Sequence, residues 1–126
     1  MLSDNNLNKS IVYAGSDTFS IQPLQRLLSL KYRRITVLTR PPKKQGRGMK
    51  VKNNPLAEFA IQHNLETLIP ESPNENSFLE KMAERKPDAL ITSAYGKLLS
   101  EAFLDSFYIG SINIHPSLLP RRRGPS

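Results

Sequence analysis

The chain has 126 residues, 38% of them hydrophobic and 23% charged, and carries a formal net charge of +7. This length supports one domain with a modest core. It has no cysteine, which excludes disulfide bonds and thiolate metal sites, and its two histidines, His63 and His115, have no partner at ligand spacing. No apolar run approaches the roughly 20 residues that cross a bilayer. We therefore expect a globular protein without a metal site or a membrane segment.

The first part of the chain predicts a strand, a helix and a second strand. Residues 11–15 form an apolar run that stops at Gly15, and Ser16 or Asp17 can then cap a helix over residues 19–30. Residues 35–39 are rich in β-branched side chains, which favours a strand, and two prolines follow it. Residues 43–54 contain two glycines among many basic and amide side chains, and we expect a long mobile loop there.

The alternation continues to the end of the chain. Asn54 and Pro55 are typical of a helix start. The remaining pattern predicts strands at residues 66–69, 89–93 and 111–115, and helices at residues 77–86 and 101–107. Strands that alternate with helices indicate an α/β fold, a Rossmann-like open parallel sheet with helices on both faces. We expect residues 1–10 to be an N-terminal extension and residues 11–126 to be a single domain.

The most informative pair of side chains lies on the last predicted strand. Side chains two residues apart project from the same face of a strand, so Asn113 and His115 should lie together. Ligands of open α/β sheets bind outside the carboxyl ends of the strands, where this pair is expected. A neutral hydrogen-bond donor beside a proton carrier suits acyl chemistry. The alternative is a core histidine whose ring bonds to the backbone.

The positive charge is concentrated in one part of the chain. Residues 18–57 contain no acidic side chain but hold Arg26, Lys31, Arg33, Arg34, Arg40, Lys43, Lys44, Arg47, Lys50 and Lys52. Such a segment suits a polyanion, since neutralised phosphates release counterions. A solvated basic surface is an equally good interpretation of the composition alone.

Three other features favour structural interpretations. The turn after residues 11–15 has one glycine where a dinucleotide fingerprint needs three, which disfavours a nicotinamide-dependent oxidoreductase. His63 lies near a predicted helix C-terminus, where a histidine is stabilised by the helix dipole. For Tyr95 and Gly96 we favour a packed ring with its hydroxyl in water and a chain turn, over a pocket wall for a flat ligand.

Four segments in order resemble one known family. They are residues 12–20 (Val-Tyr-Ala-Gly-Ser-Asp-Thr-Phe-Ser), 39–48 (Thr-Arg-Pro-Pro-Lys-Lys-Gln-Gly-Arg-Gly), 94–99 (Ala-Tyr-Gly-Lys-Leu-Leu) and 113–124 (Asn-Ile-His-Pro-Ser-Leu-Leu-Pro-Arg-Arg-Arg-Gly). The whole set is similar to the folate-dependent formyltransferases, especially to members that act on methionyl-tRNA. The chain looks most like the N-terminal catalytic domain of the fungal, mitochondrial branch, so the resemblance implies the mitochondrial matrix, with the cytoplasm as the alternative.

The resemblance also implies an activity and its residues. The activity is transfer of a formyl group from 10-formyltetrahydrofolate to the amino group of initiator methionyl-tRNA, in translation initiation and without a metal. Asn113 and His115 would be catalytic. The folate would contact Tyr95, Gly96, Ser117, Leu118, Leu119 and Pro120. The tRNA would contact Arg40, Lys43, Lys44, Arg47, Lys50 and Lys52. We expect no membrane partner and a monomer.

One departure from the family pattern limits this expectation. The family's third catalytic residue is an aspartate a few tens of residues beyond the Asn-x-His motif, and it is absent from this chain, which stops at Ser126. We therefore expect a domain incomplete at its C-terminus, with little or no catalysis by this chain alone. The alternatives are a formyltransferase for a small amine, either glycinamide ribonucleotide or an amino sugar, and a non-catalytic module that binds tRNA or folate.

Overall fold

The computed structural model describes residues 4–45 and 50–115, and its elements alternate as the sequence predicts. In chain order they are α1 (Asp4–Leu7), β1 (Ser10–Gly15), the 3₁₀ helix η1 (Thr18–Ser20), α2 (Ile21–Ser29), β2 (Arg34–Leu38), β3 (Lys43–Gln45), β4 (Lys50–Lys52), α3 (Pro55–Gln62), β5 (Glu66–Leu68), α4 (Asn76–Arg85), β6 (Ala89–Ser93), α5 (Glu101–Leu104) and β7 (Gly110–Asn113).

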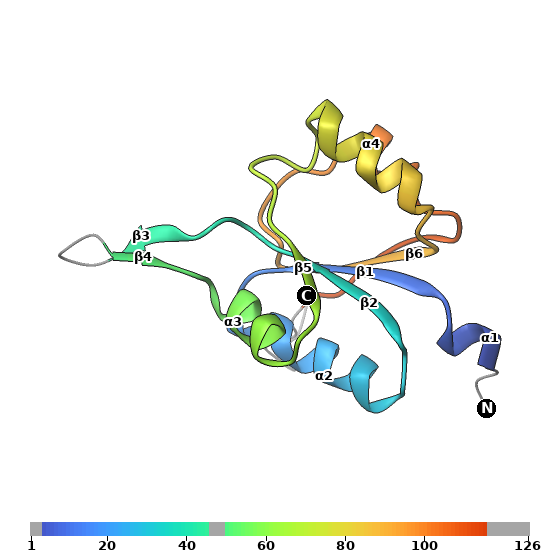
Figure 1. Cartoon of the computed structure of the whole chain (residues 1–126), viewed down its shortest axis with the longest axis horizontal. Coiled ribbons are helices and arrows are strands. Elements are labelled where there is room, and N and C mark those ends of the chain that lie inside the picture. Colours follow the sequence, from blue (N-terminus) through green and yellow to red (C-terminus); the bar gives the residue numbers. More distant parts are fainter. Residues whose placement is uncertain (1–3, 46–49, 116–126) are drawn as a thin grey trace, which may run out of the picture.

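Five of the strands form one sheet in the order β5-β2-β1-β6-β7, and all neighbouring pairs in it are parallel. Helices α2 and α3 cover one face of this sheet and α4 covers the other (Figure 1). The Rossmann-like open parallel sheet expected from the sequence is therefore confirmed. The strand order reverses between β1 and β6, and sheets of this kind bind ligands at the carboxyl side of such a reversal.

The central strand β1 separates two apolar clusters. Ile11 and Tyr13 belong to the cluster that contains Leu24 of α2 and Leu56 of α3. The intervening residues Val12 and Ala14 belong to the cluster on the opposite face, which α4 and α5 cover. A strand buried on both faces has no polar side to show to solvent, which explains why residues 11–15 form an uninterrupted apolar run.

Side-chain caps begin the helices at the predicted places. Asp17 accepts a hydrogen bond of 3.2 Å from the backbone nitrogen of Ser20, and Asn54 accepts one of 2.9 Å from that of Ala57. Each cap satisfies a helical N–H that has no intrahelical partner. The first capped turn is the 3₁₀ helix η1, so the regular helix α2 begins only at Ile21, two residues later than expected.

The prediction of a long loop over residues 43–54 was wrong for residues 43–45 and 50–52; residues 46–49 lie outside the described residues. In place of a long loop, β3 and β4 form an antiparallel ribbon that projects from the body of the molecule (Figure 1). Lys43 pairs with Lys52 and Gln45 with Lys50 in this ribbon. Short strands of lysines lack the apolar alternation that identifies a strand in a sequence. The two strands form here through the pairing of their backbones.

The two ends of the chain differ slightly from expectation. A short helix, α1, lies within the expected N-terminal extension, and the backbone nitrogen of Ser10 donates a 2.7 Å hydrogen bond to Asp88. At the other end β7 stops at Asn113, so His115 lies just beyond the strand rather than in it.

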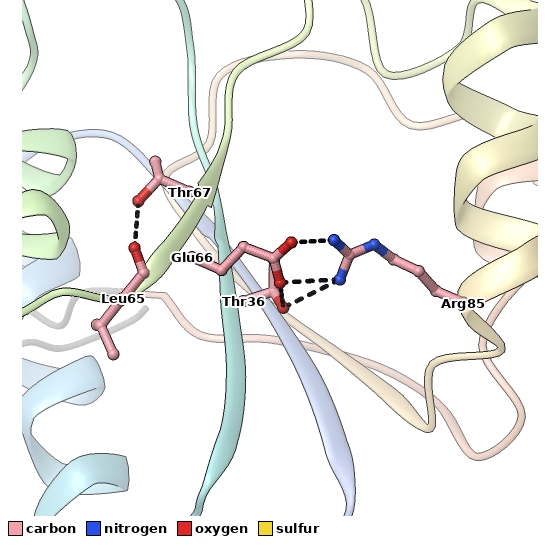
Figure 2. A network of polar contacts seen from close by, with 5 residues as sticks. All are labelled: Thr36, Leu65, Glu66, Thr67 and Arg85. Atoms are coloured by element: carbon pink, nitrogen blue, oxygen red, sulfur yellow. Dashed lines mark hydrogen bonds and ion pairs between the residues drawn. The ribbon is translucent and has the colours of Figure 1, made fainter.

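A polar cluster ties β5 to the C-terminal end of α4 (Figure 2). Both guanidinium Nη atoms of Arg85 contact the carboxylate of Glu66, one of them at 3.0 Å from Oε1. The hydroxyl of Thr36, on the neighbouring strand β2, donates a 3.0 Å hydrogen bond to the same Oε1. The Arg85 guanidinium holds the pKa of the Glu66 carboxyl below its usual value, and Thr36 adds to this effect.

None of the helices within residues 4–45 and 50–115 is both long enough and apolar enough to cross a membrane.

Candidate active site

Residues of β6, of the turn that follows it, of α5 and of β7 border a cleft of about 520 Å³ at the carboxyl edge of the sheet. Its walls include Thr92 at the end of β6, Tyr95 and Gly96 in the turn that follows, and Asn113 and His115 at the end of β7. Two sets of residues expected from the sequence, the catalytic pair and one folate wall, therefore lie in the same cleft. Ser117, Leu118, Leu119 and Pro120 lie outside the described residues.

The side chains of Asn113 and His115 contact each other. Nδ2 of Asn113 lies 3.1 Å from Nε2 of His115. The Thr92 hydroxyl donates a 2.8 Å hydrogen bond to Oδ1 of Asn113, so the other end of the amide, its nitrogen, faces the imidazole. A ring nitrogen that receives an N–H is the unprotonated one, which assigns the imidazole proton to Nδ1. The pair thus combines an amide donor with an imidazole nitrogen able to accept a proton.

Thr92 was not singled out from the sequence, although it orients Asn113. It lies directly opposite Asn113 in the pairing of β6 with β7, and the backbone nitrogen of Ile114 donates a 2.7 Å hydrogen bond to the Thr92 carbonyl. The available signal was a polar residue near the end of a strand that begins Ala-Leu-Ile. That signal becomes specific only once the register of the two strands is known.

Tyr95 corrects one expectation. We favoured a hydroxyl in water, but the side chain is only 3% exposed and its hydroxyl is buried without a hydrogen-bond partner among the described residues. Burial raises the pKa of Tyr95 to about 12, against a smaller opposite effect of the Arg40 charge. The hydroxyl therefore stays protonated and neutral at physiological pH.

The turn that follows β6 contains two residues with positive φ. Ala94 has φ of 56° and Gly96 has φ of 86°, both in the left-handed region. The Ser16 hydroxyl, which follows β1, donates a 2.7 Å hydrogen bond to the Ala94 carbonyl. Arg40, which we expected among the tRNA contacts, lies against Gly96 and donates a 3.2 Å hydrogen bond to Ser16. This turn is therefore tied to the segments that follow β1 and β2.

The basic residues lie next to the cleft. Lys43 and Lys52 are exposed and opposite each other at the base of the ribbon, and Lys44 and Lys50 belong to its two strands. Arg47 lies outside the described residues. Gly96 and Lys97 line both the cleft and an adjoining hollow of about 340 Å³ that Arg40 and Lys43 also line. The hollow thus lies between the cleft and Lys43, the first residue of the ribbon.

The features interpreted as structural remain so. A Cβ atom on Gly15 would lie 2.6 Å from the Ser20 hydroxyl and 2.7 Å from the Ser93 carbonyl, so glycine is needed for close packing of strand and helix. His63 caps the C-terminus of α3, and its Nδ1 lies 3.0 Å from the Phe59 carbonyl. Within residues 4–45 and 50–115, no three His, Asp or Glu side chains come close enough together to hold a metal ion.

Comparison with known proteins identifies relatives over nearly the whole chain. The family model described as formyl transferase matches residues 9–126. Proteins named methionyl-tRNA formyltransferase are 41% identical over 114 residues in Ruminiclostridium cellulolyticum, 42% over 115 in Caldanaerobacter subterraneus and 39% over 116 in Thermotoga maritima. These alignments cover 90%, 90% and 92% of this chain, but only 36%, 37% and 37% of the relatives.

The chain therefore spans little more than a third of the length of these relatives. All three are bacterial proteins, so they give no support to the mitochondrial matrix that we expected. The resemblance inferred from the four sequence segments is confirmed by the family match, which includes each of them. From this match, and from about 40% identity with three of its relatives, we conclude that the chain belongs to the formyl transferase family.

Proposed function

We propose that this chain takes part in the transfer of a formyl group from 10-formyltetrahydrofolate to the amino group of initiator methionyl-tRNA. The observation that carries the proposal is the contact between Asn113 and His115 in a cleft whose adjoining hollow reaches Lys43 of the basic ribbon. Membership of the formyl transferase family and the names of the relatives support it.

Asn113 is suited to bind the formyl oxygen. The amide nitrogen carries two N–H groups, of which one faces His115, while Oδ1 on the other side of the amide accepts from the Thr92 hydroxyl. The formyl oxygen gains negative charge when the amine attacks the carbonyl carbon, and a donor oriented in advance stabilises that charge. Such a donor typically contributes about 3 kcal/mol to the transition state.

His115 is suited to move the proton. The attacking amine must lose a proton as its nitrogen bonds to the formyl carbon, and the folate nitrogen must gain one as its bond to that carbon breaks. Once the bound amine takes the place of the Asn113 N–H, the unprotonated Nε2 can accept the first proton. It can then donate that proton to the departing folate nitrogen, so that the formyl group and a proton change places. General acid–base catalysis of this kind is worth about 10²–10⁴-fold in rate.

The folate and the tRNA have separate places in this proposal. A cleft of about 520 Å³ has the size of a small-molecule site, and its Tyr95–Gly96 wall would face the folate together with Ser117, Leu118, Leu119 and Pro120. The tRNA phosphates would meet Lys43, Lys44, Arg47, Lys50 and Lys52. Facing lysines such as Lys43 and Lys52 repel each other across a ribbon, and a bound polyanion would relieve that repulsion.

The remaining assignments are also proposals. Residues 11–126 would be the catalytic domain, and the protein would act as a monomer, which light scattering during gel filtration would measure. The bacterial origin of the relatives favours the cytoplasm over the mitochondrial matrix, and antibody labelling of cells that make the protein would distinguish the two compartments.

The test is a formyl-transfer assay of this chain with 10-formyltetrahydrofolate and three acceptors: initiator methionyl-tRNA, glycinamide ribonucleotide and an amino-sugar nucleotide. In keeping with the expectation of little catalysis by this chain, we expect slow transfer, to the tRNA alone, and its loss in Asn113→Ala and in His115→Ala. His63→Ala is the matched control, because it removes the other histidine, which stacks on Phe59 away from the cleft.

Transfer only to a small amine would replace the tRNA by that acceptor. Binding of folate and tRNA without any transfer would support the non-catalytic alternative instead. Equal loss of activity in the His63 variant would contradict the assignment of His115.

A further inference from the structure

The guanidinium of Arg40 lies flat against Gly96. A Cβ atom added to Gly96 would meet Nη1, Cζ and Nε of Arg40 at 3.2, 3.3 and 3.4 Å, three nearly equal distances to one planar group. A Cβ atom at this position would force the guanidinium to shift by a few tenths of an ångström. Gly96 also has φ of 86°, a conformation that residues with a Cβ rarely adopt. The glycine thus permits both the turn and the contact.

The same guanidinium also contacts the turn indirectly, through Ser16. Its Nη2 donates a 3.2 Å hydrogen bond to Oγ of Ser16, which is 2% exposed. The Ser16 hydroxyl donates in turn to the Ala94 carbonyl at 2.7 Å and lies 3.4 Å from the Tyr95 carbonyl. Arg40 therefore reaches the backbone of the turn at Gly96 directly and at Ala94 through one serine.

The backbone of Arg40 is itself anchored. Asn54, which caps α3, donates its amide to the Arg40 carbonyl at 3.3 Å and to the Thr39 hydroxyl at 2.8 Å. Nε of Arg40 is buried and has no hydrogen-bond partner among the described residues. A guanidinium held in this way has fewer N–H groups free to bind an RNA backbone.

We infer that Arg40 is a positioning residue for the folate wall of the cleft, in place of the tRNA contact that the sequence led us to expect. It acts through the turn of residues 94–96, which borders the cleft beside Asn113 and His115. Two of the three residues in that turn have positive φ, so it needs outside contacts to stay in one conformation. The role in ligand binding rests on the proposed function, whereas the effect on the turn does not.

Two variants separate positioning from charge. Arg40→Lys keeps the charge but loses the planar group that covers Gly96, and Arg40→Ala loses both. If the inference holds, the NMR backbone order parameter of Gly96 falls from about 0.85 in the unsubstituted protein to below about 0.6 in both variants. Order parameters across α3 report whether the fold is intact. Wild-type order at Gly96 in both variants would overturn the inference.

Ligand binding gives the second readout. We expect both Arg40 variants to bind 10-formyltetrahydrofolate about ten-fold more weakly, with little change in affinity for initiator methionyl-tRNA or in its salt dependence. Lys43→Ala should show the opposite pattern, with the salt slope reduced by about 0.9. The inference would be overturned if Arg40→Lys bound folate and tRNA as the unsubstituted protein does while Arg40→Ala showed a reduced salt slope. Arg40 would then be a phosphate contact. If the unsubstituted chain binds no folate, the proposed function fails, and the order parameters alone decide the role of Arg40.

Discussion

Thr92 and Asn113 lie directly opposite each other on β6 and β7, and the Thr92 hydroxyl donates a 2.8 Å hydrogen bond to Oδ1 of Asn113. With Oδ1 bonded to Thr92, the amide nitrogen is the end that faces His115. An amide turned the other way would present its oxygen to the imidazole, which would then have to donate a proton from Nε2. The orientation of the amide thus sets the tautomer of the neutral imidazole next to it.

Replacement of Thr92 should therefore change the tautomer of His115. Thr92→Val keeps the shape of the side chain but removes the donor to Oδ1. We expect the neutral imidazole to pass from the Nδ1–H form to a mixture with the Nε2–H form, and formyl transfer, where it is measurable, to fall by up to about ten-fold, the value of one hydrogen bond.

The ¹⁵N chemical shifts of the ring, recorded in alkaline buffer, distinguish the two tautomers. Thr92→Ser keeps the hydroxyl and is the matched control. Unchanged shifts in Thr92→Val would mean that another contact orients Asn113.

Two buried tyrosines should respond oppositely to loss of their hydroxyls. The Tyr13 hydroxyl donates a 2.6 Å hydrogen bond to the Ser20 carbonyl, whereas the Tyr95 hydroxyl has no partner among the described residues. Tyr13→Phe should lower the free energy of unfolding by about 1 kcal/mol, and Tyr95→Phe should raise it by a similar amount, because an unsatisfied buried hydroxyl destabilises the folded state.

Urea unfolding of the two variants at neutral pH makes the comparison. Each protein serves as the control for the other, since both lose the same atom from a buried ring. A destabilised Tyr95→Phe protein would indicate that water or a residue outside those described satisfies the hydroxyl.

The sequence allowed the five-stranded sheet and its main helices to be predicted because each of these elements carried its own signal. The run of residues 11–15 marked a strand buried on both faces, and Asp17 and Asn54 marked helix starts. The shared face of Asn113 and His115 followed from the two-residue period of a strand, and the two side chains are in contact. Each of these inferences needed only neighbours in sequence.

The missed features depend on segments that are distant in sequence. Thr92 meets Asn113 through strand register, and Arg40 meets Gly96 because the segments after β2 and β6 converge at one edge. A positive charge in a basic segment suggests an exposed RNA contact, and nothing local indicates that a glycine 56 residues away makes room for it. The burial of the Tyr95 hydroxyl likewise follows from tertiary packing.

The ion pair between Glu66 and Arg85 should contribute to stability in a pH-dependent way. The pKa of Glu66 is lowered in the folded protein, so the folded state favours the carboxylate. The contribution is therefore present above the ordinary glutamate pKa of about 4.3 and is lost as the pH falls through the lowered value. The side chains of Arg85 and Glu66 are 34% and 51% exposed, so we expect only about 0.5 kcal/mol.

Glu66→Gln tests this expectation, because it keeps the shape of the side chain and removes its charge. The difference in unfolding free energy from the unsubstituted protein should be present at pH 7 and should shrink toward zero in acid. Glu84→Gln, an exposed carboxylate near the end of α4, is the control and should show no such trend. A difference that persists unchanged in acid would mean that Glu66 stabilises the edge by packing rather than by charge.

The base of the ribbon should show a conflict between stability and binding. Lys43 faces Lys52 across the two strands, and like charges in that position repel. Lys43→Glu converts the pair to opposite charges, so we expect slower hydrogen exchange of the backbone amides in β3 and β4, equivalent to a few tenths of a kcal/mol. The same change removes a phosphate contact, so tRNA affinity should fall and its salt slope should decrease by about one.

Lys81→Glu is the matched control, because it alters the net charge equally at an exposed position on α4, away from the ribbon. It should leave both the exchange of β3 and β4 and the salt slope unchanged. If both lysine variants reduce tRNA binding equally, net charge rather than the ribbon governs the affinity. Lys43→Glu could also slow exchange without weakening tRNA binding. That result would mean that the facing lysines at the base of the ribbon do not contact the tRNA and have another role.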